Sequence, residues 1–188
     1  MPLRAVVCCT LLFIIGLPAT AQLQLQPYTE LGYAWGGIDA LGGRVATAAA
    51  VVGRTGLALR YRRAAWALEG SLGAKWLFPR GRFDGAPYRG RALRLSAPMG
   101  LGRRLRGGSW MAAGYEAQNE RDLDELERRA TYVWRHNAWL RWELPYRRWL
   151  LGLTAYRALS NNPPTFYLAD PRWSAALRIG YQLGGKDE

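Results

Sequence analysis

The chain has 188 residues and a formal net charge of +12, with nine tryptophans and ten tyrosines. A basic balance of this size indicates a polyanionic partner, such as nucleic acid, anionic lipid or lipopolysaccharide phosphate. Both cysteines, Cys8 and Cys9, lie close to the N-terminus. The rest of the chain therefore excludes disulfides, thiol chemistry and cysteine-ligated metal.

Residues 1–21 are predicted to form a signal peptide that is cleaved on export. Arg4 supplies a positive n-region, residues 5–17 form an apolar h-region, and Ala19-Thr20-Ala21 matches the A-x-A cleavage pattern. The apolar run has 13 residues, whereas a membrane-spanning helix needs about 20. The mature domain is predicted to be 22–188. An exported domain rarely meets nucleic acid, so lipid and lipopolysaccharide are the expected partners.

Eight segments of the mature chain alternate between apolar and polar or small residues, which is the pattern of β-strands with two different faces. In chain order they are 24–36, 55–62, 65–78, 91–103, 109–118, 130–144, 149–159 and 172–183. Residues 44–53, rich in Ala and Val, either extend the second strand or belong to a long loop. No mature segment offers 18 consecutive apolar residues, so a transmembrane helix is not expected there.

The third segment shows the alternation most clearly. Its even positions carry Trp66, Leu68, Leu72, Trp76 and Phe78, whereas its odd positions carry Glu69, Ser71 and Lys75. Trp66 and Trp76 are ten residues apart. On a strand tilted by about 45° with a rise of ~3.3 Å, they stand roughly 23 Å apart along a barrel axis. Outer-membrane β-barrels carry an apolar band of about 25 Å that is flanked by aromatic residues.

The connections between the segments alternate between short and long. Short turns are predicted at 62–63, 103–108 and 145–148, and long loops at 37–54, 79–90, 119–129 and 161–171. This rhythm is typical of outer-membrane barrels, whose periplasmic turns are short and whose outer loops are long. The sequence therefore predicts an all-β fold: an eight-stranded antiparallel up-and-down transmembrane β-barrel in the outer membrane, with both termini in the periplasm.

A soluble, lipocalin-like barrel also alternates, but with its apolar side chains inside. Three features favour the membrane: small residues crowd the polar face, the strands are long, and Trp and Tyr stand near the ends of the apolar face. The predicted aromatic girdle consists of Tyr33, Trp35, Tyr61, Trp66, Trp76, Tyr132, Trp134, Trp142, Trp149, Trp173 and Tyr181.

The opposite parity of the strands carries ten ionisable residues. They are Glu30, Arg60, Glu69, Lys75, Arg94, Glu116, Arg135, Arg141, Glu143 and Arg178. The interior of an eight-stranded barrel is just wide enough for side chains to fill, and buried charges must be paired. We therefore predict an ionic network that plugs the lumen of a barrel with a structural or interaction role. The alternative is a small, weakly anion-favouring channel of the porin kind.

Two segments carry a family resemblance. Leu93-Arg-Leu-Ser-Ala-Pro-Met-Gly-Leu-Gly-Arg103 resembles the fourth strand of the PorT-like outer-membrane β-barrel domain, in which a strand with a Pro precedes a basic turn. Leu177-Arg-Ile-Gly-Tyr-Gln-Leu183 resembles the terminal strand of that family and of OmpA/OmpX-type barrels. The resemblance covers about 24–183. It implies that the barrel-assembly machinery recognises the terminal strand. It indicates where the protein is located more than what its function is.

A lipid A-modifying barrel enzyme is a less favoured hypothesis. The chain has one histidine, His136, with Asn137 and Glu143 as polar neighbours, and Ser160 is the hydroxyl near the outer end of the seventh segment. At this spacing the residues do not form a recognisable catalytic triad of nucleophile, general base and orienting group. We therefore expect no enzymatic activity, no catalytic residues, no cofactor and no bound metal.

Two loops are candidate contact sites, 119–129 for a partner and 161–167 for a ligand. Residues 119–129 are rich in both charges, with Leu123 and Leu126 spaced as on one helical turn. Residues 161–167 form an extended segment that ends in Phe166 and Tyr167. The simpler interpretation of 119–129 is a solvated cap on the outer loop, whereas Phe166 and Tyr167 would either contact a ligand or pack on the rim.

Overall fold

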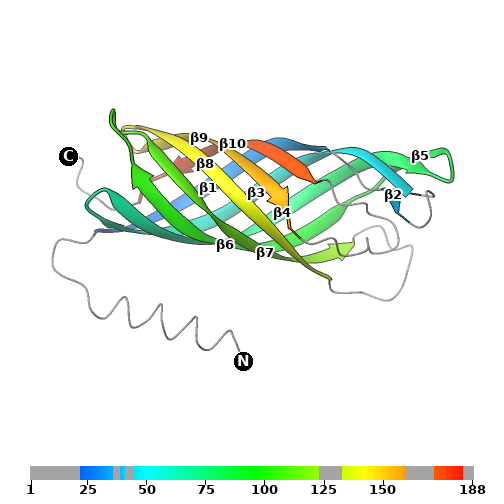
Figure 1. The fold of residues 1–188 in the computed structure, drawn as a ribbon, viewed down its shortest axis with the longest axis horizontal. Helices are drawn as coiled ribbons and strands as arrows, with labels where there is room; N and C mark the ends of the chain where they lie inside the picture. Colours follow the sequence, from blue (N-terminus) through cyan, green and yellow to red (C-terminus); the bar gives the residue numbers. More distant parts are fainter. Residues whose placement is uncertain (1–21, 36–38, 41–44, 123–132, 160–171, 184–188) are drawn as a thin grey trace, which may run out of the picture.

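The computed structural model describes residues 22–35, 39–40, 45–122, 133–159 and 172–183 (Figure 1). The elements in the described residues are strands: β1 Gln22–Trp35, β2 Asp39–Ala40, β3 Val45–Arg63, β4 Trp66–Phe83, β5 Ala86–Arg89, β6 Ala92–Arg104, β7 Trp110–Asp122, β8 Val133–Tyr146, β9 Trp149–Ala158 and β10 Trp173–Tyr181. Within these ranges, no helix is long and apolar enough to cross a membrane.

Eight of the described strands form a closed antiparallel ring, which confirms the predicted up-and-down barrel (Figure 1). The order around the ring is β3, β1, β10, β9, β8, β7, β6 and β4, and the pairing of β3 with β4 closes it. The first and last strands pair from Tyr28 opposite Gly180 to Trp35 opposite Trp173. Closure gives every ring strand two neighbours and leaves no edge open.

The two ends of the barrel differ. Tight connections at Ala64-Ala65, 105–109 and 147–148 lie at the same end as the beginning of β1, since Gln22 is paired with Arg62. We call this the turn end, and the opposite end the loop end. The turn predicted at 62–63 is wrong by two residues, because β3 continues through Arg63 and Ala64 makes the turn with a φ of +51°.

Residues 45–53, predicted as either strand or loop, are strand. They form the first half of β3, which pairs with β1 on one side and with β4 on the other. Ala50 and Val52 are buried on the same parity as Ala58 and Arg60. The loop predicted over 37–54 is therefore wrong from Val45 onward, because small and β-branched residues continue the inward face of the strand.

The loop predicted at 79–90 is instead a β-hairpin. β4 runs on to Phe83, and β5 pairs with it from Arg80 opposite Arg89 to Phe83 opposite Ala86. Asp84 and Gly85 join the two strands with φ values of +47° and +80°. Asp-Gly with both φ values positive is the residue pair that a two-residue type I′ hairpin turn favours. β2 and β5 both lie outside the ring, at the loop end (Figure 1).

The predicted loop at 119–129 is also shorter than expected, because β7 extends through Asp122. The remainder of that loop, with Leu123 and Leu126, lies outside the described residues, as do residues 161–171 with Phe166 and Tyr167.

Trp139 is a tryptophan that lies inside the barrel, where Gly100 leaves room for its indole. Trp139 on β8 is buried, and the cross-strand ladder runs from Trp139 to Gly114 on β7 and on to Gly100 on β6. A Cβ atom at Gly100 would lie 2.5 Å from an indole carbon of Trp139. The indole N–H donates a hydrogen bond to the carbonyl of Tyr115 at 3.2 Å. The indole thus lies over the part of the barrel wall where side chains are absent.

Replacing Gly100 with alanine is expected to lower the free energy of unfolding by about 1–3 kcal/mol. The new methyl group would lie 2.3 Å from the carbonyl oxygen of Ala113, so backbone and indole would both have to move. Gly70→Ala is the matched control, because a Cβ there has no neighbour within 4 Å. Chemical denaturation of the folded barrel measures both variants, and equal stability of the two would contradict the packing of Trp139 on this wall.

Candidate functional site

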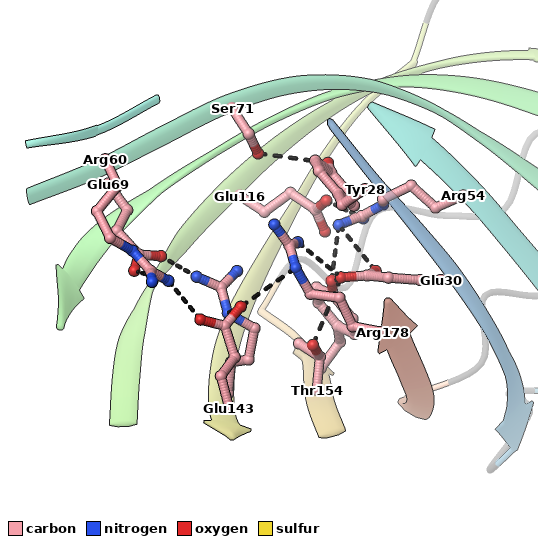
Figure 2. A network of polar contacts seen from close by, with 12 residues as sticks. Tyr28, Glu30, Arg54, Arg60, Glu69, Ser71, Glu116, Glu143, Thr154 and Arg178 are labelled. Atoms are coloured by element: carbon pink, nitrogen blue, oxygen red, sulfur yellow. Dashed lines mark hydrogen bonds and ion pairs between the residues drawn. The ribbon is translucent and has the colours of Figure 1, made fainter. Parts of the chain in front are cut away.

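The ten ionisable side chains predicted to point inward are all buried. Each has a relative exposure of 6% or less: Glu30, Arg60, Glu69, Lys75, Arg94, Glu116, Arg135, Arg141, Glu143 and Arg178. They come from seven of the eight strands of the ring, all except β9. Figure 2 shows that many of them meet inside the barrel, where strands far apart in the sequence face one another.

Four of these side chains form a closed ring of alternating charge in the half of the barrel nearer the turn end. Arg60 Nη2 lies 2.6 Å from Glu69 Oε1, and Arg60 also pairs with Glu143. Arg141 pairs with Glu69, and its Nε lies 2.8 Å from Glu143 Oε1. Within this ring each acid contacts two bases and each base two acids, so the four side chains carry no net charge together.

A second cluster surrounds Glu30. Arg178 Nη1 lies 3.1 Å from Glu30 Oε1, and Arg54 Nη1 lies 3.5 Å from Glu30 Oε2. The Tyr156 hydroxyl donates to Glu30 at 2.8 Å and accepts from Arg54 Nη1 at 2.7 Å. Arg54 also pairs with Glu116. The network therefore connects strands β1, β3, β7, β9 and β10 through the interior (Figure 2).

Arg178 joins the two clusters. Its Nη1 contacts Glu30, and its Nε lies 3.3 Å from Glu143 Oε1. Its guanidinium also stacks over the ring of Tyr28, with 3.7 Å between the guanidinium carbon and the ring centroid. Buried charges are tolerated when they are paired and hydrogen-bonded. These ion pairs therefore form one continuous network through Arg178.

Neutral polar side chains complete the hydrogen bonding of the acids. Asn137 Nδ2 donates to Glu116 Oε2 at 3.0 Å, and Gln118 donates to the same oxygen. Thr154 Oγ1 donates to Glu30 Oε1 at 3.4 Å. An ionised carboxylate accepts at both oxygens, and these donors supply bonds beyond those from the arginines.

Positive charge predominates inside the barrel. The described buried side chains include seven bases and four acids, an excess of three positive charges. Lys75 lies opposite Arg54 on one neighbouring strand and opposite Arg94 on the other. Lys75 Nζ lies 5.1 Å from the centre of the Tyr156 ring, and Arg94 Nη1 donates to Gln118 Oε1 at 3.4 Å. A cavity beside Lys75 and Arg94 measures about 10 Å³, which is barely the space of one water.

Arg54, which is 1% exposed and central to the Glu30 cluster, was not among the residues predicted to point inward. Arg54 fell in the segment predicted as a loop. Its parity with Arg60 was the available signal, but the Ala and Val run upstream offers no contrast between faces. Trp110 was missed as well. It is buried at the turn end, with Arg60 and Arg62 over its ring at 5.2 and 5.3 Å.

The outer face of the barrel is apolar, with aromatic residues toward both ends. Of the predicted girdle, Tyr132 lies outside the described residues, and Tyr61 and Tyr181 are partly exposed. The exposed members are Tyr33, Trp35, Trp66, Trp76, Trp134, Trp142, Trp149 and Trp173. Arginines stack on this girdle at both ends: Arg103 lies 5.2 Å from the Trp66 ring at the turn end, and Arg157 lies 5.1 Å from the Trp173 ring at the loop end.

The residues considered for lipid A chemistry do not share one surface. His136 is half-buried on the outer face, where its ring stacks on Tyr115 with 5.6 Å between centroids, and its Nδ1 is hydrogen-bonded to the Tyr115 hydroxyl. Asn137 and Glu143 are buried in the interior. Ser160 lies outside the described residues. In the described ranges, no three His, Cys, Asp or Glu side chains are grouped to bind a metal ion.

The chain matches no protein-family model and no curated protein. The resemblance of 93–103 and 177–183 to PorT-like and OmpA/OmpX-type barrels therefore stays a prediction. The fold is that of an eight-stranded barrel whose interior is charged and whose outer face is apolar.

Proposed function

We propose that this protein is an integral outer-membrane β-barrel with a structural or interaction role and a lumen plugged by side chains. Residues 1–21 would be removed on export. Both ends of the mature chain, and the tight turns, would then face the periplasm. The barrel-assembly machinery would read β10, and the outer loops are the candidate sites for a protein partner.

The observation that carries this proposal is the inverted distribution of polarity. Leu31, Leu72 and Leu177 are 66%, 71% and 69% exposed on the outer face, whereas Arg54, Arg60 and Glu116 are at most 1% exposed inside. A water-soluble barrel buries its apolar side chains and exposes its charges. The arrangement seen here matches a barrel whose outer solvent is hydrocarbon.

The apolar surface also goes around the whole barrel. Every strand of the ring contributes at least one large exposed hydrophobic side chain, for example Leu57 on β3, Met111 on β7, Leu140 on β8 and Leu153 on β9. Soluble monomers rarely expose contiguous apolar patches beyond a few hundred Å². A belt that encircles the molecule favours lipid over a single protein partner, which would cover one side.

The interior supports a plug more than a pore. The ion pairs cross the lumen from strand to strand, and Arg178 joins both clusters near the middle. A structural or interaction barrel needs no open path. The excess of three buried positive charges is the one feature that favours the alternative, a small anion-favouring channel.

Cell fractionation and gel migration test the proposed location. We expect the protein in the outer-membrane fraction, soluble only with detergent, and migrating differently on gels when boiled and unboiled, because an intact barrel resists denaturation by detergent. A folded monomer in the soluble periplasmic fraction would overturn the proposal.

Conductance recordings in planar bilayers, made on the same preparation, distinguish a plugged barrel from a channel. The plugged barrel should show no steady ohmic conductance. Steady conductance with anion preference, reversed or reduced by Lys75→Glu, would replace the plug with the channel.

A further inference from the structure

The outer face of β4 changes from apolar to basic within two residues. On this parity, Leu72, Trp76 and Phe78 are exposed apolar residues, and the next two positions are Arg80 and Arg82, also exposed. The change occurs beyond the ring's apolar belt, toward the loop end, where β4 pairs with β5 (Figure 1). From the sequence, residues 79–90 were predicted to be a long loop, with no function assigned.

Two further arginines join the same face. Arg89 on β5 lies directly opposite Arg80, and Arg91 follows two residues later; both are exposed. The backbone N–H of Gly90 donates to the carbonyl of Pro79 at 3.0 Å, which holds the end of β5 against β4. Like charges directly opposite on antiparallel strands destabilise the pair. An anion between Arg80 and Arg89 would remove that cost.

Three of these arginines, Arg80, Arg89 and Arg91, border a groove with an apolar floor. The groove has a volume of about 450 Å³, and its described lining is Val51, Phe78, Pro79, Arg80, Arg89, Gly90 and Arg91. Val51 and Phe78 are cross-strand partners on β3 and β4. Among the described residues that line the groove, none is acidic. The groove therefore combines concentrated positive charge with a hydrophobic surface, which suits an anion that carries hydrocarbon.

The position of the groove along the barrel suits a lipid headgroup. Arg80 follows Trp66 by 14 residues on one strand. At a rise of ~3.3 Å and a tilt of about 45°, this is roughly 33 Å along the axis. The hydrocarbon core of a bilayer is about 30 Å thick. The arginines thus reach the headgroup level of the leaflet at the loop end, whereas Phe78 stays at its hydrocarbon boundary.

We propose that this groove binds the phosphate-bearing lipid anchor of lipopolysaccharide in the outer leaflet. The inference rests on the proposed function, since only an outer-membrane barrel meets this lipid from its loop end. Arg80 and Arg89 would both bind one phosphate group, because each planar guanidinium can donate two parallel hydrogen bonds to phosphate. The first methylenes of an acyl chain would lie on Phe78 and Val51.

Native mass spectrometry of the detergent-solubilised barrel with added bisphosphorylated lipid A tests the site. We expect the wild type to retain lipid A and Arg80→Gln/Arg89→Gln to bind it at least about tenfold more weakly, since two charge-assisted contacts are lost. Arg80→Lys/Arg89→Lys keeps the charge without the paired geometry and should fall between them. Arg103→Gln/Arg104→Gln is the matched control, because both arginines are exposed at the turn end, where Arg103 stacks on Trp66.

Equal lipid A retention by the wild type and the Arg80→Gln/Arg89→Gln variant would overturn the site. Inorganic phosphate is the second probe: if it displaces lipid A at equal concentration, the site recognises free phosphate and the lipid assignment is wrong. Folding each variant into phosphatidylcholine vesicles separates this failure from failure of the proposed function. If the barrel inserts but shows no preference for lipid A, only the proposed site is contradicted. A chain that stays in solution and does not fold into the vesicles contradicts both the lipid A site and the proposed membrane location.

Discussion

Replacing Glu143 with glutamine is expected to lower the free energy of unfolding by about 3–5 kcal/mol, the usual cost of removing one partner from a buried ion pair. Glu143 is 1% exposed and contacts three buried arginines, Arg60, Arg141 and Arg178. Glutamine keeps the shape of the side chain but removes its charge. The positive excess inside the barrel would then rise by one at the point where both clusters meet.

Two variants calibrate this loss. Glu69→Gln should cost less, because Glu69 pairs with two arginines, Arg60 and Arg141, whereas Glu143 pairs with three. Asp84→Asn should change stability by less than about 0.5 kcal/mol. Asp84 is an exposed carboxylate in the β4–β5 turn, and Asn tolerates the same positive φ. Urea titration of the barrel folded in phosphatidylcholine vesicles, followed by tryptophan fluorescence, ranks all three.

A double variant tests whether the effect comes from the ion pairs. Glu143→Gln/Arg60→Gln removes an acid and one of its bases together, so it should lose less stability than the two single changes added. Strict additivity, or a loss for Glu143→Gln no greater than for Asp84→Asn, would mean that the network contributes little to holding the barrel together.

Placing an arginine at Leu72 is expected to destabilise the barrel by about 2–4 kcal/mol in lipid, the cost of a cationic side chain facing the bilayer midplane. Leu72 is 71% exposed on the outer face of β4 and lies between Trp66 and Trp76, near the middle of the apolar band. On a soluble protein, a residue this exposed accepts such a substitution within about 0.5 kcal/mol. The stability of the Leu72→Arg variant therefore distinguishes whether Leu72 faces lipid or water.

Leu105→Arg is the control for Leu72→Arg. Leu105 is 36% exposed in the β6–β7 turn, beyond the apolar band at the turn end. A charge near the interface costs about 0–1 kcal/mol. Both variants are measured by unfolding from the same vesicles. Equal and small effects at the two positions would contradict a transmembrane orientation, whereas a loss at Leu72 alone would support it.

The sequence by itself determined the faces of the strands. Side chains alternate with a period of two along any strand, so the parity of each residue follows from its immediate neighbours. That is why all ten predicted inward charges are buried, and why Trp139, on the same parity of β8 as Asn137 and Arg141, lies inside over Gly100. The Asp84-Gly85 pair was an equally local signal for a hairpin, but the surrounding arginines were read as a loop.

Only the tertiary structure decided which charges meet. Arg60 and Glu143 are 83 residues apart, and Glu30 and Arg178 are 148 apart. Their depth in the barrel depends on the register of every strand between them and on closure of β3 against β4, which are non-local quantities. The arginine groove has the same origin. Arg80 and Arg89 come together because β5 folds back on β4, and alternation within either strand carries no information about its partner.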